Sequence, residues 1–349
     1  MVQKERITKA RGCFSDALSL RIFDKRVEMG DNIRSKIFPE TLELLEDTAE
    51  EKERFARLIP ELRDPARETW IYGAGGGCRA LLFATSGKAL GVRGIAGIID
   101  NHVTGERYGL PVLSFAEFLK EHEDVLVLNS VGAPAGKEIH RQCVDAGVEV
   151  MSLFEYERGW DQYFDLPAKL GLVGEGEVFV HAGCFNGDTQ KSYINWFGDT
   201  YEKMITFEPS EEQYLVCAKL FETFRDVELV KAGLSDRAGT VRFDLKTPGA
   251  SFISETGTEE IQTVSLDAYM NGGKVTFLAL DVEGEEYKAL KGAETIIRTQ
   301  KPKLAVSIYH KPEDMYELPE LIKELRPDYR LYLRHYHLLD MAETVLYAF

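Results

Sequence analysis

Two glycines and a carboxylate in the middle of the chain have the spacing of a ligand-binding turn. Residues 178–180 form a short apolar run that predicts a strand, and Gly183 and Gly187 then bracket a turn ahead of a helix. Glycines let a turn pass close beneath a ligand, and the first turn of a helix offers unpaired backbone N–H groups to it. A second apolar run ends at Glu208, where a carboxylate can hold the two hydroxyls of a ribose. The stretch therefore predicts a nucleoside site, with an ordinary strand-helix-strand turn as the alternative.

The residue between the two glycines indicates which nucleoside fits. A dinucleotide site needs the pattern G-x-G-x-x-G, because the pyrophosphate approaches the backbone at the middle glycine. Phe185 occupies that position here, which favours a ligand without phosphates. The pattern G-x-x-x-G followed later by an acid is the one that sites for S-adenosylmethionine use.

Further polar side chains follow other predicted strands in the C-terminal half. Asp281 and Glu283 come directly after a strongly apolar run, and His310 ends the strand that follows the next helix. Ser235 and Asp236 end another predicted strand. In doubly wound sheets the ligand lies over the carboxyl ends of the strands, so we expect these residues to face the same site as the glycine turn.

A second glycine turn follows a predicted strand nearer the N-terminus. Gly73, Gly75 and Gly77 belong to it, and the register that starts at Gly75 satisfies G-x-G-x-x-A, while Asp100 ends the next strand. We therefore expect a Rossmann-like domain over residues 67–150, with a second candidate nucleotide site at these four residues. The alternatives are a carboxylate that only caps a turn and a domain that is purely structural.

The composition limits the classes of partner. The formal net charge is −16 and no long basic run offsets it, which argues against nucleic acid and anionic membranes as partners. The five cysteines lack C-x-x-C spacing and predict reduced thiols, neither a zinc site nor a disulfide framework. The N-terminus has no apolar signal core, and no apolar run is long enough to span a membrane, so we expect a cytoplasmic protein.

The order of the predicted elements indicates two α/β domains and two other segments. Residues 1–66 show helical periodicity and form either an oligomerisation arm, as in a homodimer, or a layer that packs on the domain at 67–150. Residues 151–170 join the halves, and Tyr156, Trp160 and Tyr163 there are expected to pack between the domains, with a platform for the substrate as the alternative. Strands alternate with helices over residues 171–349 and a hairpin closes the chain, which predicts a mostly parallel sheet with an antiparallel C-terminal hairpin.

Five motifs occur in one order in the C-terminal half. They are VFVHAGCFNGDT, ITFEPS, VKAGLSDRAGTVRF, VSLDAYM and LALDVEGEEYKALKGAE, followed by a strand that ends in IYH. Together they resemble the FkbM-type family of S-adenosylmethionine-dependent methyltransferases, over about residues 170–349. The resemblance implies a class I methyltransferase fold, S-adenosylmethionine as cofactor, and methylation of a hydroxyl group of a sugar, glycan or natural product.

The resemblance also implies roles for single residues. Ser235 and Asp236 would lie near the adenine, and Asp281 and Glu283 would face the methyl-transfer centre. The family motif usually begins with an acid, where this chain has His181; a neutral histidine accepts one hydrogen bond but supplies no negative charge for the amino group of the cofactor. The full set of implied cofactor-binding residues is His181, Gly183, Cys184, Asn186, Gly187, Asp188, Thr189, Glu208, Ser235, Asp236 and Asp281.

The expected reaction is an in-line displacement in which a base takes the proton of the acceptor hydroxyl. We expect His310 or Asp281 to be that base, since a histidine has an ordinary pKa of about 6.5. We predict no metal, with a divalent ion held by Asp281, Glu283 and His310 as the alternative. Two other functions stay open: a non-catalytic binding or scaffold protein, and an enzyme that uses NAD or a sugar nucleotide in the N-terminal domain.

Overall fold

The chain divides into two compact units, which we describe separately. The computed structural model describes residues 2–30, 66–84, 94–132, 135–152, 162–244, 252–253, 259–336 and 341–349, together with residues 44, 60 and 64. Unit 1 comprises Met1–Asp31, Trp160–Tyr336 and Ala342–Phe349, and unit 2 comprises Asn32–Gly159 and His337–Met341.

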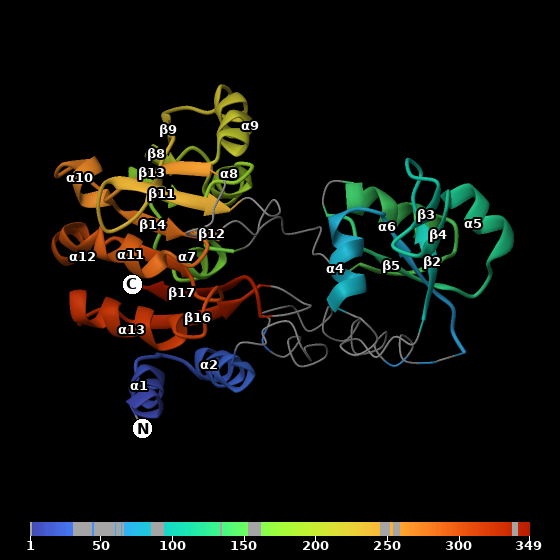
Figure 1. Cartoon of the computed structure of the whole chain (residues 1–349), viewed down its shortest axis with the longest axis horizontal. Coiled ribbons are helices and arrows are strands. Elements are labelled where there is room, and N and C mark those ends of the chain that lie inside the picture. The colour runs from blue at the N-terminus through green and yellow to red at the C-terminus, as the bar shows by residue number, and fades with distance from the viewer. Residues whose placement is uncertain are drawn as a thin grey trace. The chain divides into compact units, whose positions relative to one another are not determined.

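A seven-stranded sheet, in the order β16-β17-β15-β14-β7-β8-β9, forms the centre of the described part of unit 1 (Figure 1). Strand β7 pairs in parallel with β8 and β14, whereas β17 pairs antiparallel with β15 and β16. Every residue of β14 is buried, as expected for a parallel strand that is covered on both faces. The predicted α/β class, with a mostly parallel sheet and an antiparallel C-terminal hairpin, is confirmed. The strands are β7 (Glu177–Ala182), β8 (Tyr201–Phe207), β9 (Val227–Val230), β14 (Phe277–Leu280), β15 (Lys303–Ser307), β16 (Leu331–His335) and β17 (Thr344–Ala348).

The helices of unit 1 connect these strands. Gly187 precedes α8 with a φ of 81°, and the hydroxyl of Ser265 accepts the backbone N–H of Ala268 at the start of α10. Tyr163 and Phe164, just before α7, belong to the buried core of unit 1, so the described end of the predicted linker is part of this unit. The helices are α7 (Asp165–Lys169), α8 (Asp188–Phe197), α9 (Glu211–Phe221), α10 (Leu266–Met270), α11 (Glu286–Lys291), α12 (Glu294–Gln300) and α13 (Asp314–Leu325).

A second sheet in unit 1 changes the course of the chain after β9. It has the order β10-β13-β11-β12, formed by β10 (Gly233–Leu234), β13 (Glu259–Val264), β11 (Gly239–Asp244) and β12 (Phe252–Ile253). Strand β10 pairs in parallel with β13, whereas β11 pairs antiparallel with β13. The predicted single strand that ends at Ser235 and Asp236 is therefore two strands, which belong to different sheets.

The first two helices, α1 (Val2–Arg11) and α2 (Ala17–Met29), pack on the C-terminal half (Figure 1). Arg6 of α1 forms ion pairs with Glu317 and Glu320 of α13. Asp16 caps α2 by accepting the backbone N–H of Ser19, and it also pairs with Arg334 of β16 at 2.9 Å. This part of the predicted 1–66 extension thus covers α13 and β16, and most of the remainder lies outside the described residues.

Unit 2 contains a six-stranded sheet in the order β3-β4-β2-β1-β5-β6 within its described part. All neighbouring strands pair in parallel except β3 and β4. One apolar cluster includes Ile71, Cys78 and Leu128, and a second includes Trp70, Phe118 and Val127. The elements are β1 (Thr69–Tyr72), α4 (Gly76–Ala84), β2 (Ile95–Ile99), β3 (Gly105–Arg107), β4 (Leu110–Leu113), α5 (Phe115–Glu121), β5 (Leu126–Asn129), α6 (Ala135–Asp145) and β6 (Glu149–Ser152).

None of the helices in the described ranges is long and apolar enough to cross a membrane.

Candidate functional site

A cavity of about 420 Å³ lies at the carboxyl ends of the central strands of unit 1. Its size falls within the usual range for small-molecule sites. Residues from the glycine turn, from the ends of β7, β8 and β14, and from the second sheet line it together. The predicted site residues that line it are His181, Gly183, Cys184, Asn186, Asp188, Thr189, Glu208, Asp281 and Glu283.

The two glycines of the turn are required by packing as well as by backbone conformation. Gly183 has a φ of +91°, and a Cβ atom there would lie 1.8 Å from the carbonyl oxygen of Asp281. Gly187 has a φ of +81°, and a Cβ atom there would lie 2.5 Å from the side chain of Leu220. Gly187 does not line the cavity. The protein itself fills the space beside these two glycines, so the expectation that they leave room for a ligand is not what the structure shows.

Glu208 lies where the sequence predicts a ribose-binding acid, and its carboxylate is held in place by the backbone. One oxygen accepts the N–H of Phe185 at 2.8 Å and the other accepts the N–H of Ser210 at 2.9 Å. Burial raises the pKa of Glu208, although these two hydrogen bonds partly oppose the rise. A carboxylate oxygen has two lone pairs, so each oxygen keeps one for a ligand hydroxyl.

His181 is a buried, uncharged side chain at the end of β7. Its exposed fraction is 1%, and its Nδ1 lies 3.0 Å from the side-chain nitrogen of Gln190. Burial lowers the pKa of His181 to about 3, so the imidazole is neutral at physiological pH. As the sequence suggests, this position brings no charge to the cavity.

Asp281 is the centre of a group of hydrogen-bond donors. Its carboxylate accepts the hydroxyl of Tyr163 at 2.9 Å and that of Tyr309 at 3.3 Å, and it lies 3.4 Å from Nε2 of His310. Burial raises its pKa. Asp281 therefore holds neighbouring side chains in place, while it also lines the cavity.

His310 does not line the cavity and does not have the protonation state that a base needs. Its Nδ1 lies 3.0 Å from the fully buried carboxylate of Glu286, and its Nε2 lies 3.5 Å from Glu283. Burial alone would lower the pKa of His310, but Glu286, Asp281 and Glu283 outweigh it and raise the pKa to about 10. His310 is thus an imidazolium at neutral pH, which corrects the expected pKa near 6.5 and argues against the base role.

Glu283 is the carboxylate in this cavity whose pKa suits proton transfer at neutral pH. Burial raises its pKa to about 7, and the nearby His310 limits the rise. Its backbone φ is +54°, a conformation that a residue with a side chain seldom adopts, and such strain is common at active sites. Its side chain is 32% exposed and faces the cavity.

The side chains around Asp281 and His310 are also the candidate site for a divalent ion. Donor atoms of Asp281, Glu286 and His310 lie within 4.8 Å of one another, the only such group among the described residues. The alternative metal site predicted from the sequence contained Glu283, whereas the group in the structure contains Glu286. Metal binding would require His310 to lose its proton, and that proton is stabilised by three carboxylates. The carboxylates that would bind a cation here are thus the same ones that stabilise the proton of His310.

Ser235 and Asp236, like Gly187 and His310, do not line the cavity, and several lining residues were not predicted. Ser235 and Asp236 are absent from the lining because β10 leaves the main sheet to pair with β13 and only Gly233 and Leu234 border the cavity. Tyr163 lines the cavity, which agrees with the alternative of a substrate platform, whereas Tyr156 and Trp160 lie outside the described residues. The other unpredicted residues include Gln162, Gln213, Thr263 and Glu343, which share no motif that sequence could have identified.

In unit 2 the second glycine turn is closed by its own carboxylate. Asp100 accepts the backbone N–H of Ala74 at 2.8 Å, and its other oxygen accepts those of His102 and Val103. Burial would raise the pKa of Asp100, but these hydrogen bonds hold it below its ordinary value. At Gly73, a Cβ atom would lie 2.3 Å from the side chain of Val131. The contacts therefore match the alternative of a carboxylate that caps a turn.

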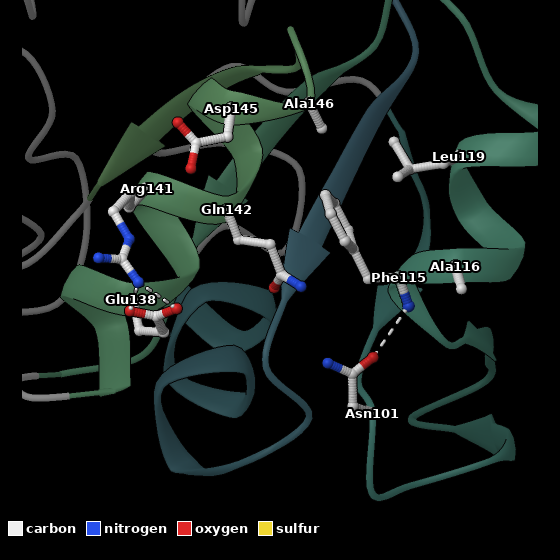
Figure 2. A pocket seen from close by; sticks show the side chains of 9 residues that line it. All are labelled: Asn101, Phe115, Ala116, Leu119, Glu138, Arg141, Gln142, Asp145 and Ala146. Carbon is white, nitrogen blue, oxygen red and sulfur yellow. Dashed lines mark hydrogen bonds and ion pairs between the residues drawn. The ribbon is translucent and has the colours of Figure 1, made fainter.

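A cavity of about 500 Å³ in the described part of unit 2 is lined by residues other than the glycines of that turn (Figure 2). Residues of α5 and α6 border it, and Asn101 closes one side by accepting the backbone N–H of Phe115. None of the four residues predicted to bind a nucleotide, Gly73, Gly75, Gly77 and Asp100, lines this cavity.

Comparisons with known proteins find a family match in the C-terminal half. Residues 178–335 match the model of the methyltransferase FkbM domain. Among solved structures, a methyltransferase FkbM from Methylobacillus flagellatus KT is 19% identical, with a TM-score of 0.48 over 95% of this chain and 99% of that chain. A fibrillarin from Aeropyrum pernix with bound S-adenosyl-L-methionine is 13% identical, with a TM-score of 0.35 over 54% of this chain and 76% of that chain.

An rRNA methylase from Streptococcus thermophilus is 15% identical, with a TM-score of 0.35 over 53% of this chain and 90% of that chain. A comparison with curated proteins finds no match. Identity and structural overlap are both low, so the likeness to the FkbM family rests on the match of residues 178–335.

Proposed function

We propose, from the premise that residues 178–335 form a methyltransferase FkbM domain, that unit 1 transfers a methyl group from S-adenosylmethionine to a hydroxyl oxygen. The acceptor is a sugar, a glycan or another hydroxylated small molecule. One observation carries the proposal: the same cavity is lined by Glu208, suited to a ribose, and by Glu283, whose pKa is about 7.

The nucleoside end of the donor fits the residues around the glycine turn. Glu208 would accept the two ribose hydroxyls with the lone pairs that its backbone hydrogen bonds leave free. Phe185 lines the cavity with 42% of its surface exposed, and its ring offers an apolar face to the adenine. These contacts use no positive charge, in agreement with a ligand that has no phosphate.

Glu283 would act as the general base. When bound, S-adenosylmethionine supplies a methyl group on a positively charged sulfur, which an oxygen can displace in line. Glu283 takes the proton of the acceptor hydroxyl while the hydroxyl oxygen attacks the methyl carbon and displaces the sulfur. A positioned base of this kind typically contributes about 10² to 10⁴-fold in rate. A carboxylate with a pKa of about 7 is a stronger base than an ordinary one and is still partly ionised at neutral pH.

His310 would act through Glu283 and Asp281 as a positioning residue. Its imidazolium lies 3.4 Å from Asp281 and 3.5 Å from Glu283 and is fixed from behind by Glu286. The positive charge limits the rise in the pKa of Glu283, which would otherwise be protonated at neutral pH. We therefore assign the base role to Glu283, and His310 supports it as a positioning residue.

Thermal unfolding with four ligands tests this function. S-adenosylmethionine and S-adenosylhomocysteine should each stabilise the protein by about 2.7 kcal/mol when present at 100 times their dissociation constants. NAD and a UDP-sugar, added at the same concentrations, should leave the unfolding temperature unchanged. Stabilisation by NAD or the UDP-sugar alone would instead indicate an enzyme that uses a nucleotide in unit 2, and no response to any of the four would indicate a non-catalytic protein.

A further inference from the structure

We propose that His181 binds the carboxylate of the donor's methionine moiety through its Nε2–H group. The inference rests on the proposed function, because it assigns a contact to the ligand proposed there. His181 lies on β7 between β8 and β14, lines the cavity, and is 1% exposed. No charge is needed for this contact, only a donor in a defined direction.

The neighbours of His181 determine which ring nitrogen carries the proton. The side-chain nitrogen of Gln190 lies 3.0 Å from Nδ1 of His181 and donates to the hydroxyl oxygen of Thr206, also at 3.0 Å. An amide nitrogen can only donate, so Nδ1 must be the acceptor and carries no proton. A neutral imidazole has one N–H group, which places the proton on Nε2.

The Nε2–H group has no hydrogen-bond partner among the residues that the structure describes. The ring stacks on Phe179, and the ring of Tyr163 lies beside it with 5.9 Å between the centroids. The hydroxyl of Tyr163 is used for contacts with Asp281 and Ser307. Buried N–H groups are nearly always paired, so an unpaired one at a cavity wall points to an acceptor that the cavity's occupant supplies.

Among the hydrogen-bond acceptors of S-adenosylmethionine, the carboxylate is the one that most needs an N–H donor. Within the described part of the chain, no lysine or arginine lines the cavity, whereas Asp281, Glu283 and Glu343 do. A carboxylate there has no cation to pair with, so it depends on N–H donors such as His181 and the first turn of α8, where Asp188 lines the wall. The ammonium group can pair with other acidic residues of the lining, such as Asp281 and Glu343.

Binding measurements with a pair of ligands test the assignment. S-adenosylhomocysteine and its decarboxylated analogue share the adenosine and the amine and differ only in the carboxylate. For His181→Phe, which keeps an aromatic ring but has no N–H, calorimetry should show at least about 10-fold weaker binding of S-adenosylhomocysteine and unchanged binding of the analogue. For the control Thr206→Val, which leaves Nε2 intact, the ratio of the two affinities should stay at the wild-type value.

Equal weakening of both ligands by His181→Phe would overturn the assignment while leaving the proposed function in place. Failure of the wild type to bind S-adenosylhomocysteine at all would overturn the proposed function itself. If His181→Phe does not fold, NMR of the wild type with ¹⁵N-labelled histidine provides the test. The resonance of the Nε2 proton should shift with S-adenosylhomocysteine and not with the decarboxylated analogue. An identical shift with both ligands would exclude the carboxylate contact.

Discussion

Glu283 and His310 lie 3.5 Å apart, and each has a pKa far from that of a free side chain. Burial makes the glutamate a stronger base, and three acids keep the histidine protonated. We predict that Glu283→Gln lowers kcat by about 10² to 10⁴-fold without changing the affinity for S-adenosylhomocysteine. A base must be ionised, so wild-type kcat/KM should rise with pH up to about 7 and then level off, and the variant should lose this rise.

Steady-state kinetics between pH 5 and 9 measure both effects, with Glu222→Gln, at an exposed position, as the control. A variant that keeps the wild-type rate and pH profile would remove Glu283 from the base role.

Glu208 should affect the binding of the cofactor and not the rate of methyl transfer. Replacing it by Ala removes the carboxylate that the N–H groups of Phe185 and Ser210 hold in place. We expect the affinity for S-adenosylhomocysteine to fall by roughly 10-fold or more, because two hydroxyl contacts are lost together. Calorimetry checks this, and Glu202→Ala at the exposed start of the same strand should bind normally. An unchanged affinity in Glu208→Ala would exclude the ribose contact.

At the scale of elements, the turn between β7 and α8 depends on how closely it approaches β14. A methyl group at Gly183 would overlap the carbonyl of Asp281, and the φ of +91° adds strain. Gly183→Ala should therefore destabilise unit 1 by more than about 2 kcal/mol, measured by denaturant unfolding. Gly174→Ala is the matched control, because no atom lies within 4 Å of the added Cβ and φ is not positive. Equal stability of the two variants would contradict the close approach of the turn to β14.

At the scale of the whole molecule, α1 and α2 stabilise a unit whose other residues start far along the chain. Asp16 both caps α2 and pairs with Arg334, which is only 8% exposed. We predict that Asp16→Ala destabilises unit 1 by about 1 to 3 kcal/mol, because a cap and a partly buried ion pair are lost together. Asp24→Ala removes an exposed pair with Arg11 and should cost less than about 1 kcal/mol. Chemical denaturation, followed by tryptophan fluorescence, compares the two variants, and similar losses would show that α2 does not support β16.

Patterns along the chain are enough to predict the fold class and to bring several of the candidate residues to one edge of the sheet. Apolar runs with helices between them specify a mostly parallel sheet, and the carboxyl ends of such strands meet at one edge, which is why the glycine turn, Glu208, Asp281 and Glu283 could be assigned to one cavity. These are local signals, read over a few residues at a time.

The tertiary structure alone decided the charges and the contacts between distant segments. His310 is protonated because the fold brings the carboxylates of Glu286 and Asp281, which follow a different strand, next to its ring. Asp100 accepts a backbone N–H group of the glycine turn, so that lone pair is not available to a ligand. Ser235 is diverted from the cavity by the pairing of β10 with β13. The pKa of a side chain and the partners of its hydrogen bonds depend on which groups lie within a few ångströms, and spacing along the chain does not contain that information.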